Sequence, residues 1–152
     1  MLSFCQRNPK WGNLKLGSSV LTMARYGCTT TAISDLSTYF KPTMIITPDK
    51  MCQYLKYTSG GLIIWESCQF TNFKFEKRIY GRNDLLIKEC LKDPNRAIIL
   101  EVDNSHWVVS TGVNLFGGYK IADPWFGDFA TTKRYKQITG SAVFTTKQKA
   151  PN

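Results

Sequence analysis

Two residues of this sequence have the types and contexts that nucleophilic catalysis requires. A catalytic cysteine acts as a thiolate, and the N-H groups at a helix N-terminus favour that form. Cys28 stands at the expected start of a helix, and Gly27 before it would let a substrate approach the backbone. His106, the only histidine, opens an expected strand and is the only side chain of its type that could serve as base. Taken singly, Cys28 also fits an ordinary apolar helix position and His106 a structural role.

Two further residues could complete such a site. Asp123 ends an expected strand that pairs with the strand of His106 through a hairpin at 116–118, so it could hold the imidazole tautomer. Asp103 competes for this role because it is closer in sequence, although it falls in a turn. Gln6 could donate its side-chain amide to an oxyanion, but a lone glutamine near an N-terminus is far more often a surface residue.

The order of these residues resembles the papain-like cysteine peptidase superfamily. The closest resemblance is to its bacteriocin-processing-peptidase-like (double-glycine peptidase-like) branch, of the kind found in phage and bacterial genomes, and it covers about residues 5–144. The motifs that carry it are Gln6-Arg7-Asn8-Pro9-Lys10-Trp11, Leu16-Gly17, Tyr26-Gly27-Cys28-Thr29-Thr30-Thr31, His106-Trp107-Val108-Val109 and Ile121-Ala122-Asp123-Pro124-Trp125.

The resemblance implies a role for each of four residues. Cys28 would be the nucleophile, His106 the general base and then acid, Asp123 the orienting group and Gln6 the oxyanion donor. Leader-processing members usually carry Cys-Gly-Pro or a close variant, whereas this chain has Cys28-Thr29-Thr30-Thr31. This departure leaves the catalytic set intact and argues against cleavage of double-glycine leaders.

The expected activity is hydrolysis of an amide bond through a Cys28 thioester. A phage or bacterial peptidoglycan hydrolase and a protein-processing peptidase both fit, so the substrate would be a peptide or a peptidoglycan-like polymer. The alternative is a catalytically silent papain-like module for binding or virion assembly. No cofactor or metal is expected, because the chain has one histidine and no Cys-x-x-Cys.

Composition indicates an ordinary globular protein with a basic surface. The 152 residues are 43% hydrophobic and 13% aromatic, which suits a single domain over 1–146 followed by a loose tail over 147–152. The net charge of +9 favours anionic partners such as cell-wall polymer. The basic residues are spread along the chain, so a solvated surface explains them as well, and nucleic-acid binding rests on net charge alone.

The N-terminus lacks the apolar core of a signal peptide, and no stretch is apolar enough to span a membrane. We therefore expect a protein that is cytoplasmic at synthesis. Release to the cell wall or carriage in a virion remains compatible with this expectation, and the oligomeric state is open.

The elements that must position these residues follow from periodicity and turn signals. Helices are expected at 28–40, ended by Lys41-Pro42, at 48–56 after the cap Thr47, and at 84–91 after the cap Asn83. The segment 62–68 is ambiguous, and 73–78 suggests a strand. Strands follow at 97–102, 107–113, 119–122 and 141–144. The predicted fold class is α+β, papain-like, with an N-terminal helical half packed on a C-terminal antiparallel β-sheet.

Overall fold

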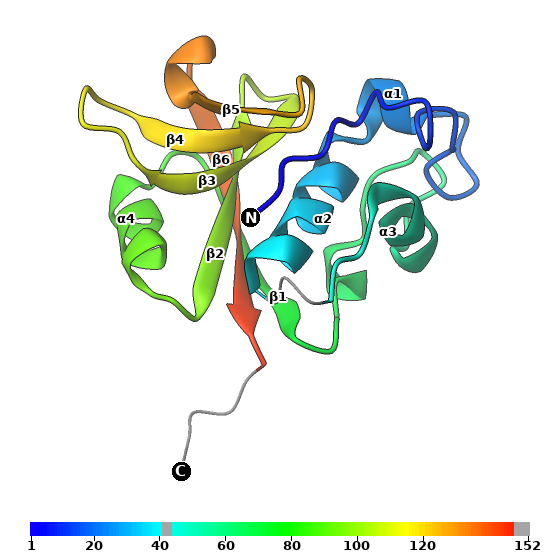
Figure 1. The fold of residues 1–152 in the computed structure, drawn as a ribbon, viewed down its shortest axis with the longest axis horizontal. Coiled ribbons are helices and arrows are strands. Elements are labelled where there is room, and N and C mark those ends of the chain that lie inside the picture. Colours follow the sequence, from blue (N-terminus) through cyan, green and yellow to red (C-terminus); the bar gives the residue numbers. More distant parts are fainter. Residues whose placement is uncertain (41–43, 148–152) are drawn as a thin grey trace.

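One antiparallel sheet organises the chain in the computed structural model, which describes residues 1–40 and 44–147. In that part of the chain the sheet has six strands in the order β1-β6-β2-β3-β4-β5 (Figure 1). The strands are β1 (Phe73–Tyr80), β2 (Arg96–Val102), β3 (His106–Val113), β4 (Tyr119–Asp123), β5 (Asp128–Thr131) and β6 (Ile138–Thr146). The helices are α1 (Met23–Tyr26), α2 (Cys28–Phe40), α3 (Pro48–Tyr54) and α4 (Asp84–Lys92), with 3-10 turns η1 (Trp65–Ser67) and η2 (Thr132–Arg134). The predicted α+β class is confirmed.

Two tight hairpins fix the register of β3. Asp103 and Asn104 join β2 to β3 with φ angles of 52° and 59°, a left-handed conformation that these two residue types tolerate better than most. Val102 then pairs with His106, which sets the histidine at the first position of β3. The next hairpin turns through Gly117 and Gly118 at φ 97° and 71°. The predicted 116–118 turn is therefore confirmed.

Both faces of the sheet are apolar, and each carries its own helices. Along β2, Ile99 belongs to the core cluster beneath α2, whereas Ile98 and Leu100 belong to the cluster beneath α4. Figure 1 shows α1, α2 and α3 on one side of the sheet and α4 on the other. The expectation of one helical half packed on the sheet is corrected here. A central strand that is apolar on both sides needs cover on both sides, and α4 supplies the second cover.

Other boundaries differ modestly from expectation. The ambiguous segment 62–68 contains the short turn η1, and α1 and β5 are elements that the sequence pattern did not indicate. Asn83 caps α4 as predicted, since its side chain accepts from the N-H of Leu86 at 3.0 Å. Lys147, in the predicted loose tail, donates its backbone N-H to Asn72 at 2.9 Å. The rest of that tail and the helix stop Lys41-Pro42 lie outside the described residues.

The N-terminal segment crosses from the helical side to the sheet. The N-H of Phe4 donates to the Asp35 carboxylate of α2 at 2.8 Å, and the N-H of Gln6 donates to the carbonyl of Pro124 at 2.8 Å. Residues 2–6 thus tie α2 to the segment after β4.

None of the helices within 1–40 and 44–147 combines the length and apolar character needed to cross a membrane.

Candidate active site

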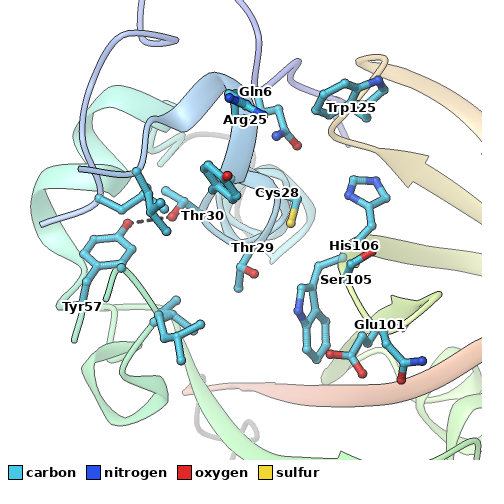
Figure 2. Close-up of a pocket in the computed structure, with 18 of the residues that line it drawn as sticks. Gln6, Arg25, Cys28, Thr29, Thr30, Tyr57, Glu101, Ser105, His106 and Trp125 are labelled. Carbon is cyan, nitrogen blue, oxygen red and sulfur yellow. Dashed lines mark hydrogen bonds between the residues drawn. The ribbon is translucent and has the colours of Figure 1, made fainter. Parts of the chain in front are cut away.

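A cleft of about 980 Å³ opens where the start of α2 faces the start of β3. Three of the four predicted site residues line it, and the fourth, Asp123, is buried behind one of them. Gln6, Cys28 and His106 are part of its wall, and Asp123 lies behind His106. Figure 2 shows the Cys28 sulfur and the His106 ring on facing walls, with Gln6 at one end of the cleft and Glu101 at the other. Residues far apart in the sequence are therefore brought to one place.

Cys28 is the first residue of α2 and is 7% exposed. Gly27 separates Cys28 from the short helix α1, and the backbone N-H of Gly27 donates to the Met23 carbonyl at 2.9 Å. A Cβ on Gly27 would stand 2.6 Å from both the Met23 carbonyl and sulfur, so a larger residue would force the chain apart here. The glycine thus serves close packing between α1 and α2, which aims the thiol from the helix N-terminus into the cleft.

His106 lies between Asp123 and the Cys28 thiol (Figure 2). Its Nε2 lies 2.8 Å from Oδ1 of Asp123, which leaves Nδ1 as the ring nitrogen available to Cys28. Burial by itself would lower the pKa of His106, but hydrogen bonding to Asp123 and to Cys28 outweighs it and raises the pKa to about 9. The ring is therefore an imidazolium at neutral pH, set between a carboxylate and a sulfur.

Asp123 is fully buried, and each of its oxygens receives two donors. Oδ1 accepts from His106 and from the N-H of Trp125 at 3.0 Å, while Oδ2 accepts from Arg134 at 2.9 Å and from the Tyr135 hydroxyl at 2.5 Å. Burial acts to raise the pKa of this carboxyl, but the bonds from His106, Tyr135 and Arg134 prevail and hold it at about 2. The group is thus a permanent anion behind the histidine.

Asp103 does not take part in this arrangement. Its carboxylate accepts from the backbone N-H groups of Lys136 and Gln137, both at 3.0 Å, and so ties the β2–β3 turn to the two residues that precede β6. Between the two candidate partners of His106, the structure selects Asp123.

Gln6 is fully buried at the end of the cleft. Its Nε2 donates to the Ala24 carbonyl at 3.1 Å, with a longer contact of 3.5 Å to that of Met23, and its Oε1 has no hydrogen-bond partner among the described residues. A side-chain amide has two N-H groups, and both have a carbonyl acceptor here, so a further acceptor would have to replace the longer contact to Met23. The alternative prediction that Gln6 is an ordinary surface residue is wrong. The role of the Gln6 amide as a donor to an oxyanion stays a prediction.

Arg134 and Tyr135 are site residues that sequence reasoning missed. They follow the short edge strand β5 through η2, and Arg134 also pairs with Asp128 at 2.9 Å. The Tyr135 ring packs on the His106 ring with centroids 5.4 Å apart. An Arg-Tyr pair in a polar loop carries no sequence signal for this placement, because only the fold of β5 against β4 brings it to Asp123.

The other cysteines lack a comparable setting. Cys52, Cys68 and Cys90 are buried, and burial raises the pKa of each thiol, to about 12 for Cys68. Cys5 is the most exposed of the five and lies 3.5 Å from the Trp125 carbonyl. Within the described ranges, no group of three or more His, Cys, Asp or Glu side chains is placed to hold a metal ion.

Comparison of the chain with models of known protein families, with characterised proteins and with solved structures gave no match.

Proposed function

We propose that this protein is a cysteine hydrolase that cleaves an amide bond through a thioester on Cys28. The observation that carries the proposal is the His106 ring, which hydrogen-bonds Asp123 at 2.8 Å and has its pKa raised to about 9 by Asp123 and Cys28 against the effect of burial. A histidine held by a buried carboxylate and facing a thiol is the arrangement that activates cysteine nucleophiles. The position of Cys28 at the start of α2 supports the same role.

Acylation proceeds from the thiolate-imidazolium form of Cys28 and His106. The sulfur attacks the amide carbonyl, a C-S bond forms, and the carbonyl oxygen becomes an oxyanion. The backbone N-H of Cys28 donates to that oxygen, and so does the Gln6 amide once one N-H gives up its longer, 3.5 Å contact to the Met23 carbonyl. His106 then donates its Nδ1 proton to the amide nitrogen, the C-N bond breaks, and an amine leaves.

Deacylation uses the same residues with a water molecule. The neutral His106 accepts a proton from water as the hydroxyl adds to the thioester carbonyl, and the oxyanion forms again. The C-S bond then breaks, which releases a carboxylic acid and restores the thiolate beside the imidazolium. Asp123 keeps its charge throughout and holds the ring with Nδ1 toward the sulfur.

The proposed substrate is a peptide or the peptide stem of a cell-wall polymer. The net charge of +9 suits an anionic wall polymer, and a phage or bacterial peptidoglycan hydrolase or a protein-processing peptidase would use the same chemistry. Clearing of purified cell walls separates the first from the second. Wall clearing or peptide cleavage that survives Cys28→Ala would contradict the thioester mechanism.

A labelling competition among the cysteines tests whether Cys28 is activated. Cys28 is 7% exposed, whereas Cys5 is intermediate in exposure, so reactivity governed by access alone would place Cys5 first. We expect iodoacetamide at limiting dose and neutral pH to modify Cys28 first, by about tenfold or more over Cys5. Peptide mass spectrometry after brief labelling measures both rates in one sample.

The matched control is His106→Ala, which removes the base and leaves the exposure of Cys5 as it is. In this variant Cys28 should lose its lead over Cys5. Cys28 reacting no faster than Cys5 in the natural protein would instead support a silent papain-like module for binding or assembly.

A further inference from the structure

The charged side chains of the cleft are unevenly partnered. Its lining contains three arginines, Arg25, Arg78 and Arg134, and a single carboxylate, Glu101. Arg134 is committed to Asp123 and Asp128 at 2.9 Å each. The charge that a ligand would meet on either side of Cys28 is therefore set by the other two arginines, Arg25 and Arg78.

The Glu101 end of the cleft is electrically balanced. Arg78 pairs with Glu101 at 3.4 Å, and the two side chains are 14% and 17% exposed. The guanidinium also stacks on Tyr80 and Trp107, 4.3 and 4.7 Å from the ring centroids. A cation so enclosed, with its own carboxylate, has little capacity left for a ligand.

The Gln6 end of the cleft carries unbalanced positive charge. Arg25 follows Ala24, the residue whose carbonyl holds the Gln6 amide, and Figure 2 shows Arg25 beside Gln6. Its described contact is the Tyr26 ring, 5.7 Å away, and no acidic side chain within the described residues pairs with it. Arg7 lies outside the cleft wall but stacks on the wall residue Trp125 at 4.6 Å and donates Nε to its carbonyl. Its Nη1 and Nη2 have no hydrogen-bond partner among the described residues. Both arginines are exposed.

We infer that the Gln6 end of the cleft is a carboxylate-binding subsite formed by Arg25 of the cleft wall and supported by Arg7, which stacks on the wall residue Trp125, so that the preferred substrate is an acidic peptide with a carboxylate close to the scissile amide. The inference rests on the proposed function for the identity of the scissile bond. Arginine is suited to this task because its planar guanidinium donates to both oxygens of a carboxylate. Trp125 adds a flat apolar wall that keeps Arg7 in place by stacking.

A pair of alkylating reagents measures the charge of this subsite without a known substrate. Iodoacetate carries a carboxylate and iodoacetamide does not, while both report on the same sulfur. Mass spectrometry of the labelled peptide gives the rate of each reagent at Cys28, and the quantity of interest is the ratio of the iodoacetate rate to the iodoacetamide rate. Dividing one rate by the other removes any change in thiolate content.

We expect Arg25→Gln to lower the iodoacetate to iodoacetamide ratio by about three- to tenfold, the size of one partly solvated charge interaction. Arg25→Lys should retain most of the ratio because it keeps the charge. The double variant Arg7→Gln with Arg25→Gln should lower it further. Lys88→Gln, an exposed lysine on α4 at the opposite face of the sheet, is the matched control and should leave the ratio unchanged.

The outcomes separate this inference from the proposed function. Rapid iodoacetamide labelling of Cys28 with a ratio unchanged in both the single and double Gln variants overturns the carboxylate subsite and leaves the hydrolase proposal standing. Slow labelling of Cys28 in the natural protein counts against the hydrolase, while the ratio still tests the subsite. About 1 M salt should shrink the difference between the natural protein and Arg25→Gln, since exposed charges are screened at that ionic strength.

Discussion

Replacing Asp123 by Asn should lower the pKa of His106 strongly. The rise of that pKa from its ordinary 6.5 to about 9 corresponds to about 3 kcal/mol of added stabilisation of the imidazolium. Burial works against this rise, so the contacts with Asp123 and Cys28 supply more than the net value. An Asn side chain keeps the size of Asp123 and an oxygen for His106 but removes the negative charge. We therefore expect the pKa to fall by one to two units, to about 7 to 8.

The orientation of the new amide follows from the donors around it. Oδ1 of Asp123 meets two N-H groups, from His106 and Trp125, whereas Oδ2 meets Arg134 and the Tyr135 hydroxyl. The hydroxyl can turn to accept from the Asn NH2, so the oxygen should stay toward His106. Arg134 cannot accept and must withdraw, and its two bonds to Asp128 at 2.9 and 3.0 Å give it another place to stay.

The chain has a single histidine, so an NMR titration needs no assignment among several rings. In tag-free protein labelled with ¹³C, the ring Cε1-H signal should titrate with a midpoint of about 9 in the natural protein. The midpoint should fall in Asp123→Asn. Arg134→Gln is the matched control, because losing a cation beside Asp123 should leave the midpoint unchanged or higher. A midpoint near 6.5 in the natural protein, or one that Asp123→Asn does not move, would refute this account of the site.

Three further substitutions probe the scaffold. Asp35→Asn should raise the melting temperature at pH 8 but hardly at pH 4. Burial raises the pKa of Asp35 well above 3.8 despite the bond from Phe4, so the folded protein loses stability as the pH rises from 3.8 through this raised pKa. Asn resembles the protonated, uncharged side chain and so avoids this loss. Equal gains at both pH values would contradict this. Tyr135→Phe should cost about 1 to 2 kcal/mol in urea unfolding, since Oδ2 of Asp123 loses one of its two donors. Asn83→Ala should cost about 1 kcal/mol by removing the cap of α4, and no loss would show that the bond to Leu86 contributes nothing.

The parts of the fold that could be predicted are those encoded by local pattern. Thr47-Pro48 and Asn83 predicted two helix starts, and the apolar runs of 97–102 and 107–113 predicted the paired strands β2 and β3. A turn between strands also fixes which residues become neighbours. For this reason the contact between His106 and Asp123 could be predicted from the hairpin between their strands.

The remaining features depend on contacts that no local pattern encodes. β5 has four residues and half-exposed side chains, so it shows no clear alternation, and it is a strand because β4 offers it an edge. The apolar residues of β2 point alternately to both faces of the sheet, Ile99 toward α2 and Ile98 and Leu100 toward α4. Because they form one continuous apolar run in the sequence, the run does not show which face α4 covers. Gln6 illustrates the same limit, because burial of an N-terminal glutamine is set by Asp35 and Pro124, both distant in sequence.

The pairing of Asp123 with four donors explains why a full negative charge can lie at this depth. An isolated carboxylate without access to water would take up a proton, and the imidazolium would then lose its partner. Arg134 and Tyr135 bind Oδ2, the oxygen that His106 does not use, so they hold the charge without competing for the bond that orients the ring. The positively charged His106 and the anionic Asp123 therefore stabilise one another. If Cys28 is the nucleophile that we propose, the reactive form of the thiol depends on Arg134 and Tyr135, which act on it through Asp123 and His106.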